Sequence, residues 1–356
     1  MVKFAEIAKF TRKALVVFTF AALPVALISA HAAETKKHVV KKPVAHKVAA
    51  KAPATKLVRH TVMVNGKRRV VLQRVAIAPV IPERASAGDL AGLNHANDSL
   101  DLKSNVAYVV DQASSQVLFE KNSEVSLPIA SITKLMTSLV VVEANQDMNE
   151  MIEVTNEDID KEKGTSSRLK IGAKLSRTDM LHIALMSSEN RAASALGRNY
   201  PGGLPAFVAA MNTKAAQLGM SDTHYVDSSG LSPHNVASAR DLVKLVNAAY
   251  QQPLIRQYST DSKYVVEPGG RPLQYSTSNH LVANPGWEIG LQKTGYIAEA
   301  GRCLVMQAMI EGRAIVMVFL DSKGKYSRQA DAGRIRKWLE TLKSPIMAKS
   351  PALAGS

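Results

Sequence analysis

Hydrophobic residues recur along this chain at two different spacings, and each spacing predicts one kind of element. Leu135, Met136, Leu139 and Val140 fall three or four residues apart, as on one face of a helix. The run Cys303–Ile310 is short and continuously apolar, which is typical of a buried strand. The patterns predict strands over 106–110, 117–119, 303–310 and 314–320, and helices over 131–144, 178–199, 205–218 and 327–342.

The order of these elements indicates the fold class. Strands lie near both ends of the patterned region and helices lie between them. Glu311-Gly312-Arg313 separates the last two strands and predicts an antiparallel hairpin, while Ile335, Trp338, Leu339 and Leu342 give the final helix one apolar face. We therefore predict an α/β fold of the α+β kind, in which an antiparallel sheet flanked by helices carries an inserted helical lobe. About 250 residues are enough for this arrangement and for a cleft between the two parts.

The first 32 residues follow a different pattern, that of an export signal. Lys3, Lys9, Arg12 and Lys13 precede an apolar stretch from Ala14 to Ile28, which is short for a membrane span. Ala30-His31-Ala32 fits a signal-peptidase site. We expect a signal peptide over 1–32 and a periplasmic protein, with an uncleaved anchor as the alternative. The single cysteine, Cys303, excludes an internal disulfide and is expected to be a buried small hydrophobe.

The net charge of +15 is concentrated in one segment. Residues 34–84 carry eight lysines and five arginines against two glutamates, so the rest of the chain is close to neutral. The Lys-, Ala- and Pro-rich composition predicts a disordered linker over 33–95, with a short hairpin over 61–75 around Asn65-Gly66. Such a basic tail could contact anionic envelope components, although a plain solvated linker is the alternative. Nucleic acid is not expected outside the cytoplasm. Residues 344–356 are predicted to be a flexible tail after a catalytic domain over 96–343.

Three short motifs carry the chemistry, and their order matters more than any one of them. They are Ser131-Ile132-Thr133-Lys134, Ser188-Glu189-Asn190 and Lys293-Thr294-Gly295. The S-x-x-K pattern alone is weak, since it recurs at 167–170 and 322–325, whereas S-x-N and K-T-G each occur once. The ordered set is the signature of penicillin-binding proteins and class A β-lactamases. It predicts an active-serine enzyme that breaks an amide bond through an acyl-enzyme.

The spacing of the first motif suits a nucleophile and its base. On a helix, Ser131 and Lys134 share one face, and a neutral lysine can take the serine proton. Burial, and the charge of Lys293 if the fold brings it close, would both lower the pKa of Lys134. Ser188 could pass a proton to the leaving amine, and Asn190 could bind Lys134 or the substrate backbone.

The third motif is expected to open a strand at the edge of the cleft. Because Gly295 has no side chain, substrate backbone could approach closely and add as an extra strand. The backbone N–H groups of Ser131 and Tyr296 are the candidate donors to the oxyanion.

The chain resembles the low-molecular-mass penicillin-binding proteins, the D-alanyl-D-alanine peptidases, from about residue 106 to about 342. Residues 186–193 resemble the endopeptidase branch of that family in particular. The matching segments are Pro128–Thr137, Met186–Ala193, Asp227–Ser232, Ser238–Leu242, Asn279–Leu281, Lys293–Tyr296 and Ala300–Val305.

The resemblance implies the DD-peptidase/β-lactamase-like fold, with the active site in the cleft. It also implies a serine endopeptidase that hydrolyses D-Ala–diaminopimelate cross-links of peptidoglycan stem peptides and is acylated by β-lactams. Ser131, Lys134, Ser188, Asn190, Lys293, Thr294 and Gly295 take the family roles, with Lys293 and Thr294 binding the substrate carboxylate. No metal or cofactor is implied.

Other readings are less favoured. A carboxypeptidase of the same family is the nearest, but its relatives add a second domain and a membrane-anchoring helix, for which we expect no room after Gly295. A class A β-lactamase needs a deacylating glutamate, and Glu267 and Glu288 lack its sequence pattern. A metallopeptidase is disfavoured because H-E-x-x-H is absent. A catalytically silent wall-binding protein would retain the fold without the activity.

Overall fold

The computed structural model describes residues 55–64, 66–76 and 84–343. Contacts divide the chain into two units at Val80, and each is described separately. The predicted signal peptide and C-terminal tail lie outside the described residues. Among the helices that the structure describes, none is both long and apolar enough to cross a membrane.

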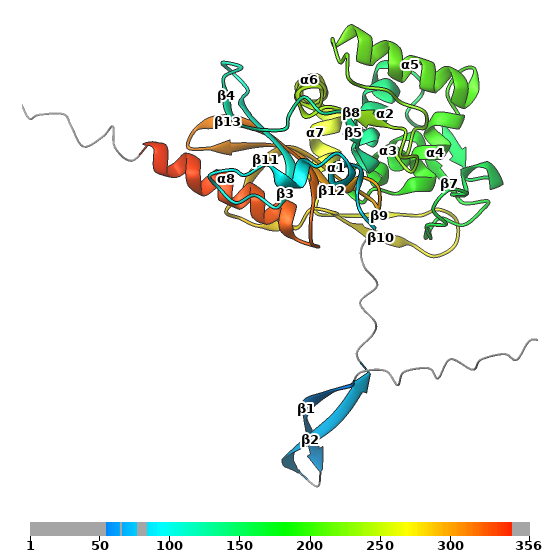
Figure 1. Cartoon of the computed structure of the whole chain (residues 1–356). Coiled ribbons are helices and arrows are strands. Elements are labelled where there is room, and N and C mark those ends of the chain that lie inside the picture. Colours follow the sequence, from blue (N-terminus) through cyan, green and yellow to red (C-terminus); the bar gives the residue numbers. More distant parts are fainter. Residues whose placement is uncertain (1–54, 65, 77–83, 344–356) are drawn as a thin grey trace, which may run out of the picture. The chain divides into compact units, whose positions relative to one another are not determined.

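In the first unit, the described residues form an antiparallel hairpin of β1 (Thr55–Val64) and β2 (Lys67–Ala76) (Figure 1). Its turn contains Gly66, whose φ of +71° suits a residue without a side chain. Both strands extend further from the turn than the range 61–75 predicts. The hairpin exposes both apolar and basic side chains, which include Leu57, Met63, Leu72, Arg59, Arg68 and Arg74.

The second unit is built on a five-stranded antiparallel sheet of strand order β11-β12-β13-β3-β4 (Figure 1). The predicted hairpin around residues 311–313 is its centre, and β11 lies at one edge. The strands are β3 (Ser104–Asp111), β4 (Val117–Lys121), β11 (Glu288–Ile297), β12 (Gly301–Ile310) and β13 (Arg313–Ser322).

The two faces of this sheet belong to two different cores, because successive side chains of a strand point in opposite directions. Leu304 and Met306 on β12 pack with Ile335 and Leu339 of α8 (Ser327–Lys343). Val305, between them, packs with the helices on the other face. Burial on both faces explains why β12 and β13 are continuously apolar rather than alternating.

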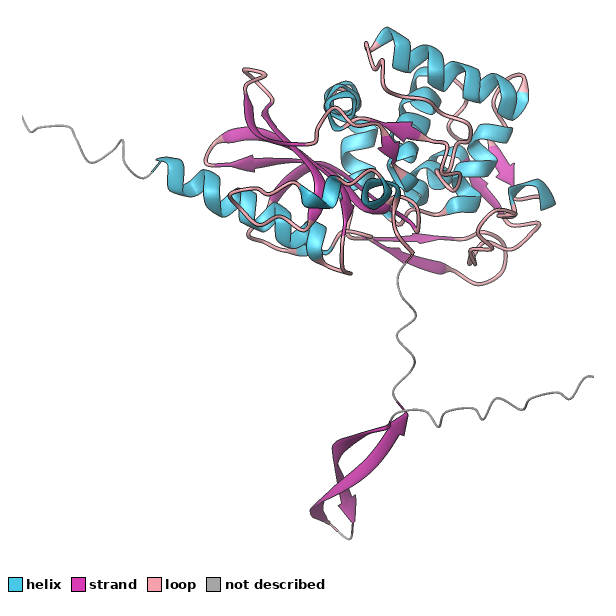
Figure 2. Cartoon of the chain, in the orientation of Figure 1, coloured by secondary structure: helices cyan, strands magenta, loops and turns pink. Residues whose placement is uncertain are grey.

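The inserted lobe between β4 and β11 consists mainly of helices (Figure 2). Its centre is α2 (Thr133–Glu143), of which nine residues are buried. Around it lie α3 (Arg177–Met186), α4 (Asn190–Arg198), α5 (Gly203–Gln217), α6 (Ala239–Tyr250) and α7 (Pro253–Thr260). Strand pairs at its margin are β5 (Leu127–Pro128) with β8 (Val236–Ala237), β6 (Met151–Glu153) with β7 (Lys174–Ser176), and β9 (Lys263–Val266) with β10 (Leu273–Ser276).

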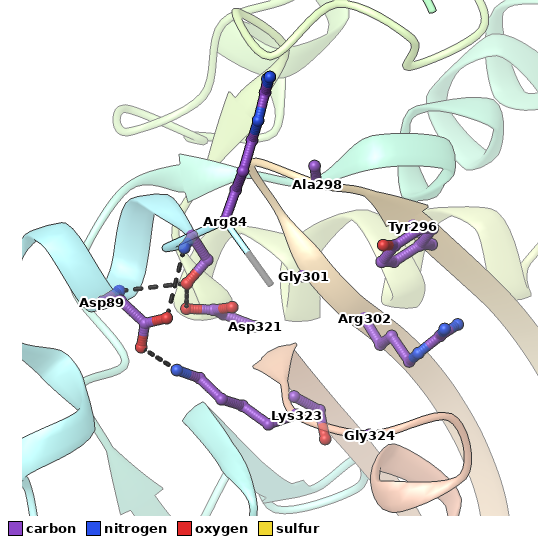
Figure 3. Close-up of a pocket in the computed structure, with 11 residues that line it drawn as sticks. Arg84, Asp89, Tyr296, Ala298, Gly301, Arg302, Asp321, Lys323 and Gly324 are labelled. Atoms are coloured by element: carbon purple, nitrogen blue, oxygen red, sulfur yellow. Dashed lines mark hydrogen bonds and ion pairs between the residues drawn. The ribbon is translucent and has the colours of Figure 1, made fainter. Parts of the chain in front are cut away.

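Residues 84–95 belong to the second unit, so they are not part of the linker that was predicted over 33–95. They form α1 (Ala87–Leu90) and the 3₁₀ turn η1 (Leu93–His95). Ser86 Oγ donates to Asp321 Oδ2 over 2.6 Å, and Asp89 pairs with Lys323 (Figure 3). These contacts fix the segment beside a small pocket of about 110 Å³ at the end of β11 and β13. Composition alone cannot predict them, since their partners lie more than 200 residues away.

Two further predictions differ in detail. The single helix expected over 178–199 is two helices, α3 and α4, separated by Ser187-Ser188-Glu189. Lys293 does not open its strand but is the sixth residue of β11. The short 3₁₀ turns η3 (Asn156–Asp158) and η4 (His280–Ala283) complete the lobe and its return to the sheet.

Candidate active site

Ser131 lies on a tight turn at the entrance of α2 rather than inside the helix. The 3₁₀ turn η2 (Ala130–Ile132) follows the β5–β8 pairing and leads directly into α2. Ala130 has a φ of +49°, which is strained for a residue with a side chain, and its carbonyl accepts a hydrogen bond from Thr133 Oγ1. This backbone leaves Ser131 half-buried and still one turn before Lys134.

Lys134 is fully buried and contacts three oxygen atoms at hydrogen-bond distance. Its Nζ lies 2.9 Å from Ser131 Oγ, 2.8 Å from Asn190 Oδ1 and 2.5 Å from the Ser229 carbonyl oxygen. The structure thus brings together the first two motifs, 56 residues apart, through one amino group.

Burial is the largest cause that lowers the pKa of Lys134, to about 8. The carboxylates of Asp227 and Glu189 act in the opposite direction. A large fraction of this lysine is therefore neutral at moderately alkaline pH, as a general base requires.

The loop from Asp227 to Ser232 holds the third oxygen in place. Asp227 Oδ1 accepts hydrogen bonds from the backbone N–H groups of Ser229 and Gly230, each over 2.6 Å. Gly230 has a φ of +80°, and a Cβ at this position would lie 2.0 Å from the Ala130 carbonyl oxygen. The loop and the serine turn are thus packed against each other without room for a side chain.

Ser188 and Asn190 lie where the lobe changes from α3 to α4. Ser188 adopts a φ of +64°, which ends α3 and turns its hydroxyl toward β11. Asn190 begins α4, and Glu189 caps that helix by accepting from the Arg191 N–H over 3.2 Å. No glycine or proline marks this break, which explains why periodicity alone predicts one continuous helix.

Lys293 is fully buried in β11 and contacts the second motif. Its Nζ lies 2.9 Å from Ser188 Oγ and 2.8 Å from the Thr294 carbonyl oxygen. Burial, followed by the charges of Lys134 and Arg328, holds the pKa of Lys293 well below its usual range. The charge of Lys134 lowers the pKa of Lys293, whereas the expected effect of Lys293 on Lys134 is not among the causes of the Lys134 shift, for which burial is the largest.

Gly295 has a structural role in addition to the predicted one. Its missing side chain points at the serine turn, where a Cβ would lie 2.9 Å from the Ile129 carbonyl oxygen and 3.0 Å from the Ser131 nitrogen. Glycine is therefore needed so that β11 can approach the nucleophile turn. The backbone of Tyr296 follows directly, while its ring is half exposed and stacks with Arg302, 4.4 Å from the ring centroid.

Several residues of the site were not predicted. Ser278 shares a 2.6 Å hydrogen bond with Thr294 Oγ1, and Arg328 on α8 donates to the Gly295 carbonyl over 3.2 Å. Asp227 and Ser229 lie in a segment that carries the family resemblance, but spacing alone gives them no role. The other S-x-x-K patterns have different contacts: Ser167 Oγ donates to Glu189, and Ser322 is buried against Ser327.

Lys134 contacts Ser131 and Asn190, and Lys293 contacts Ser188, where the antiparallel sheet meets the helical lobe. This arrangement defines a class of protein. It is the class of active-serine enzymes with the DD-peptidase fold. Sequence comparison then identifies the family: the sequence model described as D-alanyl-D-alanine carboxypeptidase, peptidase family S11, matches residues 93–324. The chain belongs to this family and is a serine-type hydrolase.

Individual relatives agree with this assignment. The chain is 47% identical over 243 residues to a protein of Pseudomonas aeruginosa named D-alanyl-D-alanine endopeptidase, which covers 68% of this chain and 78% of that relative. It is 41% identical over 277 residues to the protein of the same name from Escherichia coli K12, covering 77% and 89%.

Solved structures support the fold. A D-alanyl-D-alanine carboxypeptidase from Mycobacterium tuberculosis superposes with a TM-score of 0.62 at 26% identity, covering 69% of this chain and 94% of that one. The Streptomyces K15 DD-transpeptidase gives a TM-score of 0.62 at 23% identity, covering 67% and 98%, and this supports the fold alone.

Proposed function

We propose that this protein is a serine D-alanyl-D-alanine endopeptidase that hydrolyses D-Ala–diaminopimelate cross-links of peptidoglycan through an acyl-enzyme at Ser131. The observation that carries the chemistry is the environment of Lys134. Two of its three neighbours, Asn190 Oδ1 and the Ser229 carbonyl, can only accept hydrogen bonds. A neutral amine has two N–H donors for these oxygens, so its lone pair is left for the proton of Ser131.

The acylation step follows from these contacts. Lys134 takes the proton of Ser131, whose Oγ attacks the D-alanine carbonyl carbon. The backbone N–H groups of Ser131 and Tyr296 receive the developing oxyanion. As the C–N bond breaks, Ser188 gives a proton to the leaving amine and recovers one from Lys293, which lies 2.9 Å away. Lys293 and Thr294 hold the carboxylate beside the leaving amine.

Deacylation restores every group. Water attacks the ester carbonyl and gives up one proton, which returns through Ser188 to Lys293. Lys134 passes its proton back to the oxygen of Ser131 as the ester bond breaks. The products are the carboxylic acid of one stem peptide and the free amine of the other.

We also propose that the chain acts in the periplasm after export through residues 1–32. Penicillins and other β-lactams would acylate Ser131, because they present an amide carbonyl to the same nucleophile. The hairpin β1–β2, with exposed Arg59, Arg68 and Arg74, would contact anionic envelope components.

The test is mass spectrometry of a purified cross-linked dimeric muropeptide after incubation with the protein. Conversion into monomers that retain the donor D-alanine supports the endopeptidase. Loss of a terminal D-alanine from an intact dimer would instead establish the carboxypeptidase, which the family's description also names.

A labelling experiment tests the nucleophile. The variant Ser131→Ala should lose covalent labelling by fluorescent penicillin completely, because the acyl-enzyme needs the Oγ atom. Ser322→Ala removes the serine of another S-x-x-K pattern, outside the site, and should label normally. Labelling of Ser131→Ala would show that another residue is the nucleophile.

A further inference from the structure

A polar pocket of about 530 Å³ borders the second motif on the side of Ser188 and Asn190. Three separate segments form it: the loop before β7, the turn between α3 and α4, and the end of β10. The lining residues are Ser166, Ser167, Arg168, Ser187, Ser188, Glu189, Asn190, Gln274, Tyr275 and Ser276. The mechanism above uses only two of them.

The position of the pocket relative to Ser188 indicates which part of a substrate would enter it. In the proposed reaction Ser188 gives its proton to the leaving amine, so that amine must lie beside the Ser188 hydroxyl. The group attached to the amine then continues into the pocket that Ser188 and Asn190 line. In hydrolysis of a cross-link this group is a whole peptide, whereas in a carboxypeptidase reaction it is one D-alanine.

Arg168 gives the pocket a positive charge. Its guanidinium lies 3.9 Å from the centroid of the Tyr275 ring, and Nη1 donates to the Gln274 carbonyl over 2.7 Å. A guanidinium has five N–H donors, so others remain for a ligand. None of the ion pairs found within residues 84–343 includes Arg168.

Glu189 connects the walls of this pocket to the catalytic turn. Its side chain is buried, accepts a 2.7 Å hydrogen bond from Ser167 Oγ and lies 3.5 Å from the Tyr275 hydroxyl. Glu189 also stands between Ser188 and Asn190 in the sequence. One residue thus holds the loop of Arg168, the strand of Tyr275 and the second motif in fixed positions.

We propose that this pocket is the subsite for the leaving stem peptide, and that Arg168 binds a carboxylate of that peptide. The inference rests on the endopeptidase function proposed above. It adds a determinant of specificity, because an anionic peptide on the leaving side gains a charge-assisted hydrogen bond that a single D-alanine does not reach.

The experiment compares Arg168→Glu with Lys170→Glu in the full-length protein. Lys170 is an exposed cation two residues along the same loop and does not line this pocket, so it is a matched control for the change in charge. The substrates are a cross-linked dimeric muropeptide and fluorescent penicillin. Penicillin carries no leaving stem, so its acylation rate reports whether the site is folded and competent.

We expect Arg168→Glu to lower kcat/KM for the dimer by about tenfold, mainly through KM, while penicillin acylation stays close to wild type. Lys170→Glu should change neither. Equal kcat/KM for the dimer in Arg168→Glu and wild type would overturn the subsite. So would an equal fall of this kcat/KM in Lys170→Glu, or a matching fall of the penicillin acylation rate in Arg168→Glu. Failure of the endopeptidase proposal itself is distinguishable, because the wild-type protein would then leave the dimer intact.

Discussion

At the scale of single residues, the pKa of Lys134 connects the structure to a measurable rate. The neutral form is the base, and burial lowers this pKa to about 8. The rate of acylation by labelled penicillin should therefore rise as pH increases through about 8 and fall about tenfold per unit well below it. A rate that is constant between pH 6 and 9 would exclude Lys134 as the titrating base.

Glu189 provides a second test of the same assignment. Its carboxylate raises the pKa of Lys134, so Glu189→Gln should move the midpoint of the pH–rate profile to lower pH. The exposed Glu124 pairs with Arg240, and Glu124→Gln should leave the midpoint unchanged. A shift to higher pH in Glu189→Gln would contradict the electrostatic argument.

At Gly230 the lack of space for a side chain, and not only the positive φ, requires glycine. Gly230→Ala introduces a Cβ that meets the Ala130 carbonyl, so we expect a loss of more than about 3 kcal/mol in unfolding free energy and slow acylation. Gly219 has a similar φ of +68°, but a Cβ added there would have nothing within 4 Å. Gly219→Ala should cost only about 1–2 kcal/mol in urea unfolding. Similar losses of unfolding free energy in Gly230→Ala and Gly219→Ala would mean that the contact between the new Cβ and the Ala130 carbonyl is relieved at little cost.

At the scale of elements, α2 is attached to the loop of residues 227–232 by a buried hydrogen bond. Thr137 Oγ1 donates to the Ser228 carbonyl over 2.6 Å. Thr137→Val keeps the shape but leaves that carbonyl without its donor, so unfolding free energy should fall by about 1–3 kcal/mol. Thr137→Ser should largely restore it, as measured by urea unfolding. Equal unfolding free energies of Thr137→Val and wild type would show that another donor replaces Thr137 at the Ser228 carbonyl.

The elements also show where sequence reasoning succeeds and where it stops. The hairpin of β12 and β13 is predictable because burial on both faces gives each strand a short, continuous apolar run. The amphipathic α8 is predictable because burial of one face imposes a period of 3.6 on its residues. The break at Ser188 is not, since its left-handed backbone is stabilised by contacts with Lys293 across the cleft. The motifs identify Ser131, Lys134 and Lys293 as candidates, but the Ser229 carbonyl contributes only its backbone, which no residue pattern records.

At the scale of the molecule, every candidate catalytic residue lies in the second unit. A variant that lacks residues 1–80 should therefore be acylated by penicillin at the wild-type rate and unfold at the same temperature. Thermal unfolding and labelling kinetics measure both. A slower acylation would mean that the first unit contributes to the site.

The order of strands in the sheet has a consequence for how the protein is made. β3 comes from the start of the second unit, yet it pairs with β13, whose residues are synthesised about 200 positions later. A chain that stopped after Gly295 would contain all three motifs but lack the partner strands on which β3 and β11 depend. Covalent penicillin labelling should thus appear only after the last strand has been synthesised, so it reports completed folding of the nascent chain.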